Sequence, residues 1–175
     1  MIRLRGLVSD DAPAVRRVYS GAAVSFLGRP AMTDREAVAY VLRAARREVY
    51  GVDDDGDLVG LVKLDRRPGA HGRLSYVVRE DRWGRGYATE AVRRLVSLAF
   101  GTAGLVSLGA GHHPGNPASG RVLAKAGFTR LGPRDGVVEY HLAARPRPAA
   151  SPRAAPGTAV SPARAPAAPP PPVPD

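Results

Sequence analysis

The segment Trp83–Phe100, WGRGYATEAVRRLVSLAF, decides much of the fold because a glycine turn runs directly into an amphipathic sequence. The apolar residues that recur at helical spacing are Ala88, Ala91, Val92, Leu95 and Ala99. This spacing predicts a helix that begins between Tyr87 and Thr89 and packs one face on a core. Because Gly84 and Gly86 stand immediately before it, the helix starts behind a turn that lacks Cβ atoms at two positions.

The turn and the helix start together suit an anionic ligand. The first N–H groups of a helix have no partner within the helix and carry partial positive charge, and glycines let a phosphate approach the backbone closely. Arg85 adds a formal positive charge at the same place. The alternative is a tight strand-to-helix turn that binds nothing. Two common phosphate motifs do not fit, because Thr89 stands where a dinucleotide fingerprint needs its third glycine, and the glycines at 115 and 120 lack the Lys-Ser/Thr of a P-loop.

Strand and helix patterns continue on either side of this segment. Strands are expected at 2–8, 48–52, 58–64, 72–78, 105–111, 128–132 and 136–142, and further helices at 9–23, 33–47 and 116–127. The helix at 33–47 begins with the capping box TDRE, and its expected apolar face is Val38, Val41, Leu42 and Ala45. The order β-α-α-β-β-β-α-β-α-β-β predicts an α/β (α+β) fold, with a mixed, mostly antiparallel, twisted sheet of about seven strands and four helices.

The composition changes sharply at Arg145. Eleven of the 17 prolines lie between residues 145 and 175, where no helical or strand pattern occurs. Such a segment buries too little apolar surface to offset the entropy lost on ordering it. We therefore predict one folded domain over residues 1–144 and a disordered Pro/Ala-rich tail over residues 145–175.

Composition also narrows the class of protein. The formal net charge of +10 favours an anionic ligand or partner. The absence of cysteine excludes disulfides, thiolate nucleophiles and metal–thiolate sites, and the four histidines lack nearby carboxylates at metal-ligand spacing. The N-terminus has no apolar run long enough for a signal peptide, and no stretch approaches the ~20 apolar residues of a membrane span. We expect a cytoplasmic protein without a metal or a membrane partner, as a monomer or homodimer.

A second segment, NPASGRVLAKAGF from Asn116 to Phe128, begins with a cap residue and a proline at the first helical position. Taken together with WGRGYATEAV one strand earlier, it resembles the acetyl-CoA-binding half of the GNAT N-acetyltransferases. It most resembles the branch that includes the ribosomal-protein N-terminal acetyltransferases. The likeness is close over residues 74–130. The common family pattern opens its loop with Gln or Arg where Trp83 stands here, although this branch is similar in using an aromatic residue there.

The resemblance implies that acetyl-CoA is the co-substrate and that the acceptor is a primary amine, either a protein N-terminus or a small-molecule amine. The residues that would contact the coenzyme are Val77, Val78, Trp83, Gly84, Arg85, Gly86, Tyr87, Ala88, Thr89, Asn116 and Ser119. The backbone amides of residues 84–89 would hold the pyrophosphate, and an amide near Val77 or Val78 would face the developing oxyanion. The pantetheine arm would lie between the strands at 72–78 and 105–111, where the family's sheet splays apart.

The same resemblance leaves the catalytic groups open. The tyrosine that many members carry in the last helix is replaced by Leu123, and Ser119 is the substitute acid that this branch suggests. A serine on a helix surface is the alternative interpretation. Glu139, Glu80 and His112 are candidates for the general base, and Glu139 is chosen because its strand is expected near the acceptor pocket. Without cysteine an acetyl-cysteine intermediate is impossible, so the amine would attack the thioester directly.

The alternative function is a basic nucleic-acid- or phosphate-binding module without catalysis. In that case the positive charge would attract nucleic acid, and the glycine turn would hold a backbone phosphate. The basic residues are scattered and the aromatic residues are few, which argues against a nucleic-acid partner.

Overall fold

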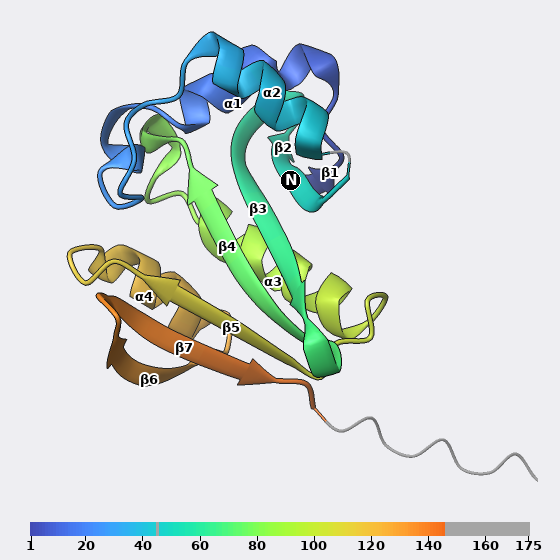
Figure 1. The fold of residues 1–175 in the computed structure, drawn as a ribbon, viewed down its shortest axis with the longest axis vertical. Coiled ribbons are helices and arrows are strands. Elements are labelled where there is room, and N and C mark those ends of the chain that lie inside the picture. The colour runs from blue at the N-terminus through green and yellow to red at the C-terminus, as the bar shows by residue number, and fades with distance from the viewer. Residues whose placement is uncertain (45, 146–175) are drawn as a thin grey trace, which may run out of the picture. The chain divides into compact units, whose positions relative to one another are not determined.

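The computed structural model describes residues 1–44 and 46–145 (Figure 1). Seven strands form one sheet in the order β1-β2-β3-β4-β5-β7-β6. The strands are β1 Ile2–Arg5, β2 Glu48–Asp54, β3 Asp57–Arg67, β4 His71–Val78, β5 Ser107–His112, β6 Thr129–Arg134 and β7 Val137–Ala143. Every neighbouring pair is antiparallel except β4 and β5, which are parallel. The predicted mixed, mostly antiparallel sheet is confirmed.

Four α-helices pack on this sheet in the described part of the chain, in the predicted element order. They are α1 Ala12–Val18, α2 Asp34–Ala44, α3 Tyr87–Phe100 and α4 Pro117–Lys125. Neighbouring residues of a strand point to opposite faces, so Val62 of β3 lies in the core with α3, whereas Leu61 lies in the core with α1 and α2. In Figure 1, α3 runs behind β3 and β4, and α1 and α2 lie across one end of the sheet.

The sheet opens between its two parallel strands. β4 has eight residues, but only three of them pair with β5, from His71 opposite Ser107 to Arg73 opposite Gly109. Beyond these pairs the two strands diverge, and Figure 1 shows the gap widening toward the end of β4. The expected splay between these strands is therefore present.

Helix α2 buries a different face from the one expected. The capping box is confirmed, because Thr33 N–H donates to Glu36 Oε2 at 2.8 Å and Glu36 N–H donates to Thr33 Oγ1 at 3.3 Å. The buried residues are Ala37, Val41 and Ala44, whereas Val38 and Leu42 are 50% and 63% exposed. Of the expected face, Val41 is buried, Val38 and Leu42 are not, and Ala45 lies outside the described residues. Two helical registers share Val41, and packing selects the one whose alanines allow close approach. The helix ends at Ala44 rather than at residue 47.

The first strand and the first helix are shorter than predicted. β1 ends at Arg5 because the chain turns there: Val8 N–H donates to Asp11 Oδ2 at 2.8 Å, and a short 3₁₀ segment follows. α1 ends at Val18, and Gly21, with φ at +56°, starts a separate 3₁₀ turn, η2 Gly21–Val24. A positive φ cannot continue a right-handed helix.

The predicted tail lies outside the described residues except for Arg145. The domain boundary near residue 144 therefore stays a prediction. Within residues 1–44 and 46–145, no helix combines the length and the apolar character needed to cross a membrane.

Candidate active site

The end of strand β4 has backbone N–H and C=O groups that are not hydrogen-bonded to a neighbouring strand. The N–H of Arg79, directly after β4, donates to a β3 carbonyl at 2.9 Å. Because backbone groups of alternate residues in a strand point to the same side, those of Val77 face β3, whereas those of Tyr76 and Val78 face β5. Pairing between β4 and β5 stops at Arg73. The amides of Tyr76 and Val78 therefore open into the gap between the strands, so the predicted oxyanion amide fits at Val78 but not at Val77, which is paired toward β3.

A glycine turn leads from this open edge into α3. Gly84 and Gly86 have φ values of +74° and +84°, and Gly86 directly precedes the first residue of the helix. A Cβ atom built at either position would meet no atom within 4 Å. The left-handed conformation, rather than crowding, therefore requires glycine here. The space in front of the helix N-terminus is left open for a ligand.

Two aromatic side chains anchor the turn. The indole Nε1 of Trp83 donates to Val78 O at 2.8 Å, which holds the ring against the end of β4. The hydroxyl of Tyr87 donates to Asp54 Oδ2 at 2.5 Å and so ties the start of α3 to β2. The turn is therefore fixed on both sides without using the amides between them.

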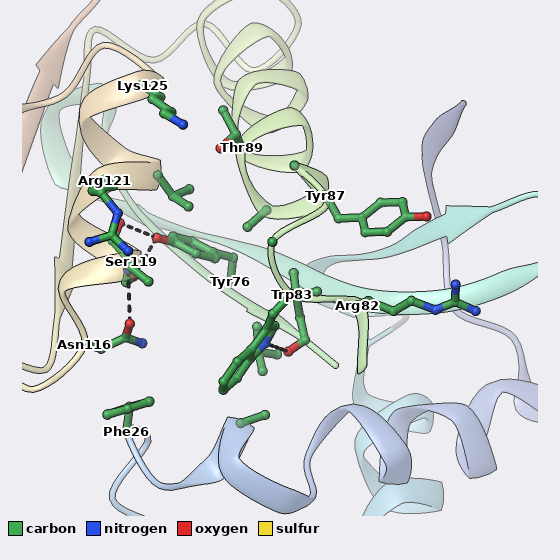
Figure 2. A pocket seen from close by; sticks show the side chains of 18 of the residues that line it. Phe26, Tyr76, Arg82, Trp83, Tyr87, Thr89, Asn116, Ser119, Arg121 and Lys125 are labelled. Atoms are coloured by element: carbon green, nitrogen blue, oxygen red, sulfur yellow. Dashed lines mark hydrogen bonds between the residues drawn. The ribbon is translucent and has the colours of Figure 1, made fainter. Parts of the chain in front are cut away.

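Helix α4 brings a hydroxyl to the same gap. Asn116 Oδ1 accepts a hydrogen bond from Ser119 N–H at 3.1 Å, and Pro117 is the first helical residue, so the predicted cap is confirmed. The hydroxyl of Tyr76 donates to Ser119 O at 2.9 Å and lies 2.6 Å from Ser119 Oγ, where either oxygen can be the donor. These bonds, drawn in Figure 2, connect α4 to β4 across the gap.

Burial raises the pKa of Tyr76 to about 12, and the hydrogen bond from Ser119 opposes part of this rise. The phenol therefore keeps its proton throughout the neutral range. Tyr76 has one hydroxyl hydrogen, and when that hydrogen goes to Ser119 Oγ instead of Ser119 O, the serine O–H is free to point elsewhere. The pair can thus present one hydroxyl hydrogen to a ligand in the gap.

A cavity of about 350 Å³ joins the strand edge, the turn and α4 (Figure 2). The predicted coenzyme-contact residues that line it are Val77, Val78, Trp83, Gly84, Gly86, Tyr87, Ala88, Thr89, Asn116 and Ser119. The volume falls within the range of ordinary small-molecule sites. The end of β4, the turn before α3 and helix α4 thus line one cavity of ligand size.

The cavity has a basic end and an apolar end. Arg121 and Lys125, one turn apart on α4, line it; Figure 2 shows Lys125 near Thr89, Arg121 beside Ser119, and Phe26 at the opposite end from Lys125. Phe26 and Leu27 come from the segment after η2. That segment is held by Glu80, whose Oε2 accepts the N–H of Ala22 at 2.7 Å.

Comparison with known proteins identifies the fold. The family model described as an acetyltransferase (GNAT) domain matches residues 2–129. The chain belongs to the GNAT acetyltransferase family. It is 28% identical over 141 residues to the uncharacterized N-acetyltransferase YoaA of Bacillus subtilis (strain 168), covering 74% of this chain and 80% of YoaA.

Solved structures share the GNAT architecture. A GNAT-family acetyltransferase from Bacillus anthracis superposes with a TM-score of 0.74 at 20% identity, covering 81% of this chain and 94% of that one. The aminoglycoside acetyltransferase AAC(6')-Ib, solved in complex with coenzyme A, gives a TM-score of 0.68 at 18% identity, covering 82% and 95%. At these identities the likeness establishes the fold.

Some predicted residues of the GNAT domain lie outside the cavity. Arg85 is exposed beside the turn and does not line the cavity. Glu139 is held by Arg73, whose two Nη atoms donate to its carboxylate at 3.1 and 3.0 Å. His112 Nδ1 lies 2.8 Å from His113 O at the end of β5. Leu123 is fully buried in the core with α3, so its position cannot offer a catalytic group.

The structure also adds residues to the GNAT site that sequence reasoning missed. In the sequence, Tyr76 is part of a predicted strand, Phe26 and Leu27 fall in a segment without any motif, and Arg121 and Lys125 are part of a predicted helix. Their spacing of four residues places them on one helical face, which was the single local signal that could have indicated them.

Proposed function

We propose that this GNAT domain transfers the acetyl group of acetyl-CoA directly to a primary amine. The observation that carries the proposal is the cavity that connects the glycine turn before α3 to the open edge of β4 and to Ser119. The turn suits a phosphate group, the strand edge suits an extended arm with amide groups, and the hydroxyl suits the reacting end. A phosphate-binding module without catalysis would need only the first of these parts.

The chain offers a phosphate site and two basic side chains for the coenzyme. The N–H groups at the start of α3 and in the turn at 84–89 would bind the pyrophosphate, because they combine unpaired donors with partial positive charge. Lys125, which lies near Thr89 in Figure 2, and Arg121 line the same cavity and would add charge attraction to the phosphates. The strand edge at Val78 would hold the arm.

Acetyl-CoA supplies an activated acetyl thioester when it is bound. The neutral amine would attack the thioester carbonyl, so that an N–C bond forms and the C–S bond breaks. An amide of β4 that faces the gap, at Tyr76 or Val78, would stabilise the oxyanion. Ser119 would donate a hydrogen bond or a proton to the departing sulfur, with Tyr76 holding its oxygen at 2.6 Å.

The proton of the amine needs an acceptor, and Glu139 remains our candidate for the base. The side chain of Glu139 is 19% exposed, and its carboxylate is paired with Arg73. Action as a base would require the amine, or a water molecule next to it, to reach the carboxylate from the β5 side. Glu80 is the alternative base, and its carboxylate accepts the N–H of Ala22.

The acceptor class is the finer part of the proposal. A Vibrio cholerae protein of the same fold, proposed to be a ribosomal-protein-serine acetyltransferase, aligns at 20% identity with a TM-score of 0.68. That likeness, with the aromatic Trp83 in the loop, supports a protein N-terminus as one acceptor. A small-molecule amine is the other.

The test combines binding and turnover. Calorimetry should detect acetyl-CoA binding, and a saturating concentration near 100 times Kd should stabilise the fold by ~2.7 kcal/mol in a thermal shift. Release of the free thiol should then depend on an added amine. Binding of phosphate-bearing nucleotides without a preference for acetyl-CoA, and no amine-dependent thiol release, would instead support the non-catalytic module.

A further inference from the structure

The acceptor end of the cavity is apolar and aromatic. Its side chains include Ala23, Phe26, Leu27 and Trp83, and Leu27 and Trp83 are 41% and 44% exposed. Large apolar side chains exposed together at the mouth of a cavity mark a surface that a ligand covers. We infer that the acceptor carries its reactive amine next to an apolar group and has no second positive charge. This inference rests on the proposed function.

Charge within the cavity supports the same class of acceptor. The charged residues that line it are Arg82, Arg121 and Lys125, and no aspartate or glutamate is among its described lining residues. A polyamine or an amino sugar would bring a second ammonium group into this space. That group would find no carboxylate partner among the lining residues and would lose its hydration in an apolar wall.

Three acidic side chains outside the cavity have other partners. Glu80 accepts the N–H of Ala22, and Glu139 is paired with Arg73. Asp57 is bound by Arg79 and by Arg82. These carboxylates would have to give up their bonds to meet a second ammonium group on the acceptor.

The mouth of the cavity also holds a fixed shape. The hydrogen bond from Trp83 Nε1 to Val78 O at 2.8 Å sets the orientation of the indole, and Glu80 anchors the segment that carries Phe26 and Leu27. A preformed apolar surface costs little entropy when a ligand binds. An alkyl or aryl group on the acceptor would therefore add affinity without rearranging the site.

The apolar lining also favours the neutral, reactive form of the acceptor amine. An amine must be neutral to attack, and an environment of low polarity without a carboxylate favours the neutral form. The titratable and charged groups that face this space from β4, η4 (Glu80–Arg82), α3 and α4 are Tyr76, Arg82, Tyr87, Arg121 and Lys125. None of them is an acid that would be ionised and negative at neutral pH, so none holds the amine in its charged form.

Pentylamine and cadaverine test the inference, because they share one five-carbon chain and differ by a second amine. We expect pentylamine to have a kcat/KM at least about tenfold higher, with the same order in direct binding to the coenzyme A complex by calorimetry. Two tripeptides, Leu-Gly-Gly and Lys-Gly-Gly, make the same contrast for a peptide N-terminus. A higher kcat/KM for pentylamine than for Leu-Gly-Gly would then indicate a small-molecule acceptor, and the reverse would indicate a peptide N-terminus.

A charge variant sharpens the test. Leu27→Glu places a carboxylate at the mouth of the cavity and should shift the ratio of the two kcat/KM values toward cadaverine by about tenfold. The control is Val38→Glu, at an exposed position of α2 outside the cavity, which should leave this ratio unchanged. Equal or better use of the dicationic substrates overturns the inference, as does a ratio unaffected by Leu27→Glu or failure of both monoamines to bind. If acetyl-CoA itself does not bind, the proposed function fails and the inference fails with it.

Discussion

Gly86 shows how one residue can serve folding and ligand binding together. Its φ of +84° is strained for any residue with a Cβ atom, although the surrounding space is open. We expect Gly86→Val to lower stability by about 1–2 kcal/mol and to abolish detectable acetyl-CoA binding, because a branched side chain would stand before the helix N-terminus. Calorimetry and thermal unfolding measure the two effects separately.

Gly104 provides a matched control for this variant. It has a φ of +65° and open space around it, and it does not line the cavity. Gly104→Val should therefore cost similar stability and leave acetyl-CoA affinity unchanged. Unchanged affinity in Gly86→Val would mean that the turn has no part in binding the coenzyme.

Tyr76 and Ser119 act as one unit at the residue scale. We expect Ser119→Ala to lower kcat by about 10²-fold and Tyr76→Phe by about tenfold, while acetyl-CoA affinity changes little. The double variant should be no worse than Ser119→Ala alone, because Tyr76 works through the serine. Steady-state kinetics with calorimetric binding would establish this split between kcat and affinity.

The pH profile and a control distinguish this role from a structural one. Since burial raises the pKa of Tyr76 to about 12, its proton stays in place below that pH, and the loss in Tyr76→Phe should be the same from about pH 6 to 9. Tyr140 is a buried tyrosine near α4, and no hydrogen bond of its hydroxyl is found within residues 1–44 and 46–145. An equal loss of kcat in Tyr140→Phe would contradict the proposed pair.

At the scale of elements, two short 3₁₀ segments are joined by one carboxylate. Glu80, in η4, accepts the N–H of Ala22, in η2. This bond fixes the segment that carries the apolar acceptor wall. We expect Glu80→Ala to raise the KM for the acceptor several-fold, with acetyl-CoA affinity within about twofold, because the coenzyme binds the other side of the cavity. Kinetics at saturating acetyl-CoA measure the change.

Glu90→Ala is the control for Glu80→Ala. Glu90 pairs with Arg94 on α3 and does not line the cavity, so its loss should leave both constants unchanged. A weaker affinity for acetyl-CoA in Glu80→Ala, with an unchanged acceptor KM, would show that Glu80 supports the glycine turn rather than the acceptor wall.

At the scale of the whole domain, a buried ion cluster ties the first strand to β2. Asp53 is 1% exposed and accepts from Arg3 Nε at 3.0 Å and Arg5 Nε at 2.8 Å, and Arg5 also binds Asp11. We expect Asp53→Asn to lower stability by about 1–3 kcal/mol, since the amide cannot replace the buried charged acceptor that holds Arg3 and Arg5. Urea unfolding at neutral pH measures this loss.

The cluster also sets the acid sensitivity of the domain. Hydrogen bonds from Arg5 lower the pKa of Asp53 and of Asp11 below the ordinary 3.8. The stabilisation from a lowered carboxyl pKa is complete above the ordinary pKa and is lost as pH falls below it. The melting temperature should therefore drop below about pH 4, and it should drop less steeply in Asp53→Asn.

A surface pair separates this effect from general acid denaturation. Asp65 is paired with Lys63 at 2.7 Å and is 39% exposed, so Asp65→Asn should change neither the stability nor its pH dependence by a measurable amount. If Asp53→Asn behaved in the same way, the buried cluster would not be the source of acid sensitivity.

The sequence by itself determined the features that depend on residues close together along the chain. The caps at Thr33 and Asn116, the helix after Gly86 and the order of all strands and helices follow from local hydrogen bonds and from periodicity, and all are present in the structure. A glycine turn followed by a helix start brings its donors together within a few residues. For that reason the candidate coenzyme loop could be indicated before the fold was known.

Only the tertiary structure decided which distant groups meet. Tyr76 and Ser119 are 43 residues apart and touch because β4 and β5 separate after three pairs. Strand register likewise places Arg73 against Glu139, and packing against the core gives α2 its buried face at Val41. Such contacts depend on how strands align and where a sheet opens, and the free energies that set them come from the whole core rather than from any one segment.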